Sequence, residues 1–190
     1  MASCHSPVTN EQAHRQDSLA QIHKTDTPAA KTDSSWLLVP GVSAGKTKLD
    51  EPGDSVFKRL GKADAGDAAM GKAVAFWYTD GDSTGNVLSI YTSRDMGNDE
   101  TARVKRIRVT SPSFKTNTGL GAGSNKKAIE MGFVVKPQES YQKDGKKVTI
   151  LDAPEGIAFE VDDTGKCLAV IIHPRTDSYG SYLPLRTGVN

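Results

Sequence analysis

The chain of 190 residues has only two cysteines, Cys4 and Cys167, and neither belongs to a closely spaced pair. This spacing excludes zinc-finger and thioredoxin-type sites. Cys167 lies in an expected strand, and we predict that it is a small buried apolar side chain. A disulfide between the two cysteines is an alternative, although it would tie a polar segment to the folded part.

The sequence also lacks an excess of charge and a long apolar run. It has 24 basic and 23 acidic residues, for a formal net charge of +1. This balance gives no electrostatic basis for a nucleic-acid partner or for binding to an anionic membrane surface. No apolar run approaches the roughly 20 residues that span a bilayer. We therefore expect no nucleic-acid partner, and membrane association only through a lipid anchor.

Large apolar side chains are scarce in residues 1–35, where Val8, Leu19 and Ile22 supply nearly all of them. Such a segment cannot bury enough apolar surface to offset an ordering entropy of roughly 1–2 kcal/mol per residue. We interpret residues 1–35 as a disordered polar tether. A single domain is expected over residues 36–175, followed by a C-terminal tail over residues 176–190.

The first four residues, Met-Ala-Ser-Cys, resemble the end of a bacterial lipobox, with Met where Leu is usual. The charged and apolar parts of a signal peptide do not precede them. A polar tether behind the cysteine is what a lipid-anchored domain needs. We expect Cys4 to be lipidated and the protein to lie in the periplasm or cell envelope; an incidental cysteine is the alternative.

A glycine-rich pattern occurs twice. Residues 41–47 (GVSAGKT) are echoed 78 residues later by residues 119–125 (GLGAGSN). Residues 107–112 and 170–174 form a second echo, a β-branched run closed by proline. Internal repetition indicates a duplicated folding unit, here with repeat one over about residues 36–112 and repeat two over about 113–175.

Each repeat is predicted to be a short helix followed by a three-stranded antiparallel meander. In repeat one, Asp54 or Ser55 caps a helix that Gly61 ends. In repeat two, Ser124 caps a helix that Gly132 ends. The expected strands cover residues 73–78, 87–92 and 103–110, then 147–151, 156–161 and 166–173. The predicted fold class is α+β, with two tandem repeats that share one sheet and one core.

Two local motifs resemble ligand sites but depart from the required patterns. Residues 41–47 fail as a phosphate loop because Pro40 stands where the first glycine is needed. Residues 80–85 carry oxygen ligands at calcium-loop spacing, but position 12 is Tyr91 instead of Glu. We read both as turns, and we expect no cofactor and no metal.

A dense basic strand supplies the candidate partner-binding residues Arg103, Arg106 and Arg108, with Tyr78 and Tyr91 as candidate aromatic anchors. The strand can dock an acidic partner, or it can be an ordinary solvated sheet face. Strict alternation places Lys105, Ile107 and Val109 on one face and Val104, Arg106 and Arg108 on the other.

The two helix-plus-meander copies, each opened by a Gly-x-x-x-Gly turn, resemble the tandem-repeat fold of the β-lactamase-inhibitor protein family. The single unit also resembles a family of small outer-membrane-assembly lipoproteins. The resemblance covers roughly residues 37–174 and implies a concave sheet suited to protein binding. It carries over no inhibitory contact residue.

The expected function is a non-catalytic binding module of a bacterial envelope, lipid-anchored or secreted, monomeric, with an envelope protein as partner. One alternative is a hydrolase whose site is assembled from the distant residues His173, Asp162 and Asp163. A structural envelope protein with no discrete ligand is another. A deep pocket with converging carboxylates and histidine would favour the hydrolase.

Overall fold

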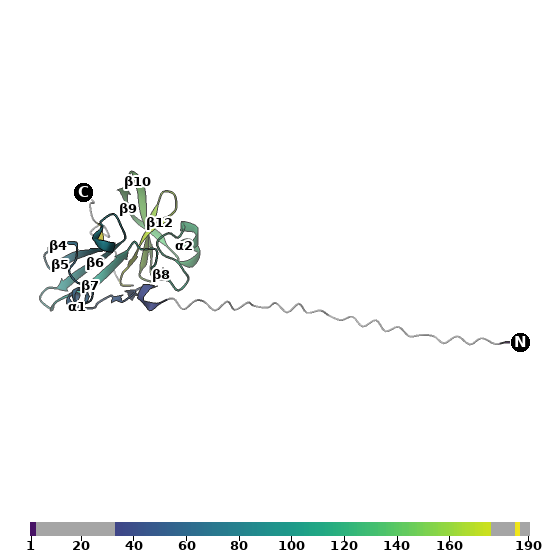
Figure 1. Ribbon diagram of the computed structural model, residues 1–190, viewed down its shortest axis with the longest axis horizontal. Helices are drawn as coiled ribbons and strands as arrows, with labels where there is room; N and C mark the ends of the chain where they lie inside the picture. The colour runs from purple at the N-terminus through teal and green to yellow at the C-terminus, as the bar shows by residue number, and fades with distance from the viewer. Residues whose placement is uncertain (3–32, 176–184, 187–190) are drawn as a thin grey trace. The chain divides into compact units, whose positions relative to one another are not determined.

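The computed structural model describes residues 1–2, 33–175 and 185–186 (Figure 1). Cys4, most of the expected tether and most of the expected C-terminal tail lie outside these residues. Residues 33–175 and 185–186 belong to one compact unit.

An eight-stranded antiparallel sheet with the order β4-β5-β6-β7-β12-β11-β10-β9 forms the centre of the unit (Figure 1). Its strands are β4 (Ala65–Ala69), β5 (Lys72–Tyr78), β6 (Val87–Asp95), β7 (Asp99–Val109), β9 (Lys136–Lys143), β10 (Lys146–Ala153), β11 (Ile157–Asp162) and β12 (Cys167–Ile172). The central neighbours β7 and β12 join the two halves of the sheet.

A small second sheet and two short helices complete the fold. The small sheet has the order β3-β2-β1-β8. Its strands are β1 (Leu37–Val39), β2 (Ser43–Ala44), β3 (Thr47–Lys48) and β8 (Lys115–Thr116). The helices are α1 (Gly53–Leu60) and α2 (Lys126–Gly132), and the 3₁₀ turns are η1 (Ser34–Trp36) and η2 (Thr79–Gly81).

The predicted α+β class is confirmed, but each helix is followed by four strands of the large sheet instead of three. The two additional strands, β4 and β9, are the outer edges of the sheet. Strand β4 has only small or acidic side chains, and β9 is polar and contains Pro137. Edge strands with such compositions lack the apolar alternation from which strands are predicted.

The helix ends differ from the predictions in detail. Helix α1 begins at Gly53, with Pro52 at the N-cap position, and Gly61 ends it with φ 80° as expected. At α2 the cap is Asn125, whose Oδ1 accepts a hydrogen bond from the Ala128 N–H at 2.8 Å. The predicted cap, Ser124, instead accepts a hydrogen bond from the Gly121 N–H at 3.0 Å.

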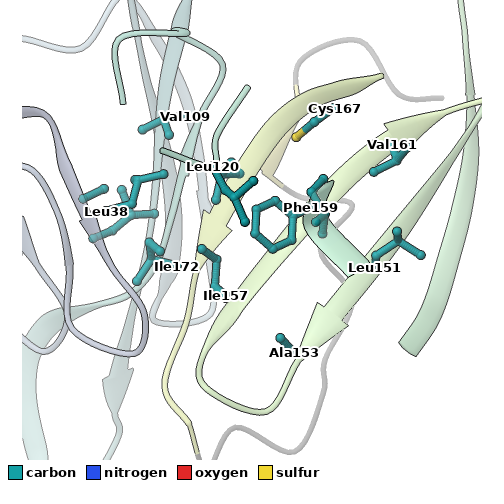
Figure 2. Close-up of a cluster of buried hydrophobic side chains, with 14 of the residues drawn as sticks. Leu38, Val109, Leu120, Leu151, Ala153, Ile157, Phe159, Val161, Cys167 and Ile172 are labelled. Carbon is teal, nitrogen blue, oxygen red and sulfur yellow. The ribbon is translucent and has the colours of Figure 1, made fainter. Parts of the chain in front are cut away.

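One face of the large sheet, the helix face, is covered by both helices and the small sheet. Its core combines β11 residues Phe159 and Val161 with Val56 of α1, Ile129 of α2 and Leu38 of β1, all buried. Figure 2 shows the Phe159 ring beside Leu120 at the middle of this cluster. The helix face therefore holds the main apolar core of the protein.

The other side of the same strands, the opposite face, has a smaller apolar cluster. It consists of Ile150, Ala158, Ile171 and Leu185, all almost inaccessible to solvent. In the described part of the chain, neither α1 nor α2 contributes to this cluster. Leu185 belongs to the expected C-terminal tail, so the folded unit includes at least part of that segment.

The basic strand β7 does not alternate as predicted. Its pairing with β6 shifts register where Tyr91 faces Arg106 and Thr92 faces Val104, which makes Lys105 an extra bulge residue. Val104 consequently joins Ile107 and Val109 in the core of the helix face. Arg106 and Arg108 point to the opposite face, whereas Val104 does not.

The two glycine-rich segments follow strands that pair with each other. Strands β1 and β8 are parallel, with Leu37 opposite Lys115 and Leu38 opposite Thr116. This register has the same 78-residue offset as the glycine pattern. At Gly121 a side chain would collide with the Phe114 carbonyl oxygen, so close backbone approach requires glycine there. The glycine at this position of the second copy therefore has a packing role.

Candidate functional site

A buried ion pair occupies the opposite face near the centre of the sheet. Arg108 of β7 binds Glu160 of β11 in a bidentate manner, with Nε–Oε1 at 2.9 Å and Nη2–Oε2 at 2.8 Å. The two side chains are only 6% and 0% exposed. Strand β12 lies between them, and its small residue Ala169 faces Glu160 in the register. The long Arg108 side chain thus reaches across a strand to its partner.

Two further groups converge on the same carboxylate. The Tyr141 hydroxyl of β9 donates to Glu160 Oε2 at 2.8 Å, and Arg186 Nε donates to Oε1 at 3.2 Å. The Arg186 guanidinium also stacks over the Tyr141 ring, 3.7 Å from its centroid. Arg108, Tyr141, Glu160 and Arg186 are hereafter called the charged cluster.

The cluster keeps Glu160 ionised. Burial alone would raise the pKa of Glu160, but the positive charge of Arg108 and its hydrogen bonds, together with Arg186 and Tyr141, lower it to about 2. Burial and the Glu160 charge raise the pKa of Tyr141. The tyrosine therefore stays neutral and remains a hydrogen-bond donor. The charged cluster holds two cations and one anion, a net charge of about +1.

A cleft of about 770 Å³ opens above the charged cluster. Its lining includes residues 83–86 between η2 and β6, and residues 142–144 of the β9–β10 hairpin. Arg108, Tyr141 and Arg186 also line it. Since β6 and β10 are four places apart in the sheet, these two connections enclose the cleft from opposite sides.

The five candidate partner-binding residues do not form one surface. Arg108 lines the cleft, whereas Arg106 and Tyr91 form a cation–π pair at 5.8 Å elsewhere on the opposite face. Arg103 pairs with an aspartate of its own strand and donates to a backbone carbonyl in the segment before α1. Tyr78 lies at the end of β5, half-buried. Of the five candidates, Arg108 and no other lines the cleft.

The residues of the alternative hydrolase site are not brought together. His173 follows β12 beside the start of β11, while Asp162 ends β11. Six residues of strand separate these positions by about 20 Å. His173 Nε2 lies 2.9 Å from Asp152 Oδ1, and its ring is buried. Asp162 instead accepts hydrogen bonds from the Thr164 side chain and backbone, which close the hairpin turn.

Cys167 is a free, buried thiol, as the sequence predicted for this strand position. Burial, followed by the nearby Glu160 charge, raises the pKa of Cys167 to about 12. The neutral thiol donates to the Ala169 carbonyl at 3.3 Å. It is thus a packing residue, because nucleophilic or metal-binding cysteines need an accessible thiolate.

No group of three or more His, Cys, Asp or Glu side chains is arranged to hold a metal ion in the described part of the chain. None of the helices in the described ranges is long and apolar enough to cross a membrane.

Sequence reasoning missed Glu160, Tyr141 and Arg186. A signal for Glu160 was present, because residues 157–161 and 168–172 are apolar at almost every position. Such runs are typical of strands buried on both faces. A single glutamate inside one of them requires a buried cationic partner. Nothing local to the sequence identifies that partner, since Arg108 lies 52 residues away.

Comparison with known proteins identified no relatives: no family model, curated protein or solved structure matches this chain.

Proposed function

We propose that this protein is a non-catalytic binding module of a bacterial envelope that receives a protein partner in the cleft on the opposite face of its sheet. The observation that carries the proposal is the cleft itself, which combines the charged cluster with flanking loops. Polar groups fixed in a concavity fit recognition of a partner. In this proposal the helix face stabilises the fold and the cleft binds the partner.

The proposal includes tandem duplication of the folding unit. Each helix precedes a four-stranded antiparallel meander, and the two meanders meet at β7 and β12. The 78-residue offset in the pairing of β1 with β8 also supports duplication. This arrangement agrees with the expected likeness to the tandem-repeat β-lactamase-inhibitor protein family, whose fold implies a concave binding sheet.

A binding role is favoured over the hydrolase alternative by the chemistry of the cleft. Glu160 is held by three donors and has a pKa of about 2, so it is a poor proton acceptor at neutral pH. His173 does not line the cleft. The groups that do line it are suited to holding a ligand.

Site-specific photocrosslinking in cells that express the protein tests this proposal. A photoreactive phenylalanine derivative is placed at Thr84 or Gln142, which are exposed residues on opposite walls of the cleft. We expect each position to yield a discrete adduct with the same partner protein. The matched control is Lys127, an exposed residue of α2, which should yield no such adduct.

Equal adducts at all three positions, or adducts only at Lys127, would contradict the assignment of the cleft.

The proposed lipid anchor has a separate test. Intact-mass analysis of the protein extracted from native membranes should show a lipid-modified Cys4. An unmodified Cys4 in a membrane-free fraction would refute the anchor without affecting the role of the cleft.

A further inference from the structure

We infer that the cleft recognises a carboxylate and that Arg186 is the residue that binds it. This inference deepens the proposed function, on which it rests, by naming the chemistry through which a partner is held. The carboxylate is assigned to an acidic side chain of a peptide segment. A free small carboxylate offers the same group and is used below as a separate probe.

The first observation is the incomplete pairing of a buried guanidinium. The Arg186 side chain is only 4% exposed. Its Nε donates to Glu160, and Nη2 lies 3.1 Å from Glu160 Oε1 in an ion pair. Among the described residues, neither Nη1 nor Nη2 has an acceptor in hydrogen-bonding geometry. Buried donors without acceptors are costly, and each calls for a partner.

Charge balance selects the class of partner. Arg108 and Arg186 together carry two positive charges, and Glu160 neutralises one of them. A single negative charge therefore neutralises the charged cluster. A dianion such as phosphate would leave excess negative charge close to the buried Glu160, which is unfavourable. A carboxylate supplies one charge and two coplanar acceptors that match the two terminal nitrogens of a guanidinium.

The position of Arg186 favours such binding. Arg186 lines the cleft, and its guanidinium is held flat by stacking on Tyr141 and by the bond from Nε to Glu160. A fixed guanidinium loses little side-chain entropy when a ligand binds. Both terminal nitrogens are buried. A carboxylate therefore reaches them only after a local rearrangement, which should alter the spectrum of Arg186.

The test is an NMR titration of the full chain that follows the arginine side-chain N–H signals. The probes are Ac-Gly-Glu-Gly-NH₂ and acetate, each with one negative charge, with Ac-Gly-Gln-Gly-NH₂ as the neutral analogue and sulfate as the competing anion. Ionic strength is held constant. We expect a saturable shift of the Arg186 signals with the Glu peptide and acetate, and none with the Gln peptide. Tighter binding of the Glu peptide than of acetate assigns the site to peptides.

Matched variants separate this site from general attraction of anions. Arg186→Met should lose at least tenfold in affinity for the Glu peptide. Arg94→Met removes an exposed arginine outside the cleft and should leave affinity unchanged. Equal shifts with the Glu and Gln peptides, no saturation, or equal binding of sulfate would overturn the inference. Tighter binding of acetate than of the Glu peptide would overturn its assignment to peptides.

The outcomes of the two tests are independent. Carboxylate binding without a crosslinked partner at Thr84 and Gln142 would refute the protein-binding role while retaining the anion site. Crosslinking at the cleft without any response of Arg186 to carboxylates would retain the binding role and refute the inference about Arg186.

Discussion

The helix face and the opposite face of the large sheet are both buried around β11, but different chemistry fills them. Phe159 on the helix face packs among apolar side chains from both helices. Its neighbour Glu160 on the opposite face is surrounded by Arg108, Tyr141 and Arg186. Adjacent residues of one strand therefore belong to an apolar core and to an ionic cluster. The difference indicates that one face mainly stabilises the fold and the other is suited to recognition.

The largest effect is expected on the helix face. Phe159→Ala should lower the free energy of unfolding by about 3–5 kcal/mol, because a fully buried ring is lost and a cavity is left at the centre of the core. Chemical denaturation followed by circular dichroism measures this change. A loss below about 1 kcal/mol would show that this face is not the main source of stability.

Breaking the charged cluster should have the next largest effect. Glu160→Gln leaves two buried arginines without their counter-charge and should lower the free energy of unfolding by about 3 kcal/mol. The triple change Arg108→Met, Glu160→Leu and Arg186→Met removes all the charges together. Its stability should return to within about 2 kcal/mol of the wild type. If the triple variant is less stable than Glu160→Gln, the cluster is itself a source of stability.

Acidification should reduce the contribution of Glu160. Its folded-state pKa of about 2 lies below its ordinary value of 4.5, so the stabilisation is fully present above pH 4.5. It is lost as the pH falls toward 2, and the total is about 3 kcal/mol. The stability difference between wild type and Glu160→Gln should shrink over this interval in denaturation curves. A difference that does not vary with pH would mean that Glu160 is not ionised in the folded protein.

The smallest effect is expected from an exposed ion pair. Asp99 binds Arg103 at 2.8 Å, and the hydrogen bonds from Arg103 and Thr101 lower the pKa of Asp99 to about 2. Solvent screens this pair, so Asp99→Asn should leave the denaturation midpoint nearly unchanged. A loss as large as that of Glu160→Gln would remove the contrast between buried and exposed charge on which the comparison depends.

Parts of the fold could be predicted because they depend on local pattern. The β11–β12 hairpin follows from apolar runs joined by an aspartate-rich turn, and Gly61 ends α1 because it adopts a positive φ. Strands β4 and β9 could not be predicted in this way. As edge strands, they bury little side-chain surface and carry no clear alternation.

The candidate site depended on features that local pattern does not encode. Because of the bulge at Lys105, every later residue in β7 lies on the face opposite to the one that strict alternation from Val104 predicts. The partners of Glu160 come from β7, β9 and Arg186, and only the topology of the sheet brings them together. The sequence could therefore suggest that Arg108 binds a partner, but it could not show that Arg108 is buried in a cluster beneath a cleft.

The most direct test of the central claim is the affinity of the triple variant of the charged cluster for Ac-Gly-Glu-Gly-NH₂, measured together with its stability. We expect that the variant stays folded, with a stability close to that of the wild type, and that saturable binding of the peptide is lost. Unchanged binding by the folded variant would contradict the assignment of recognition to the charged cluster.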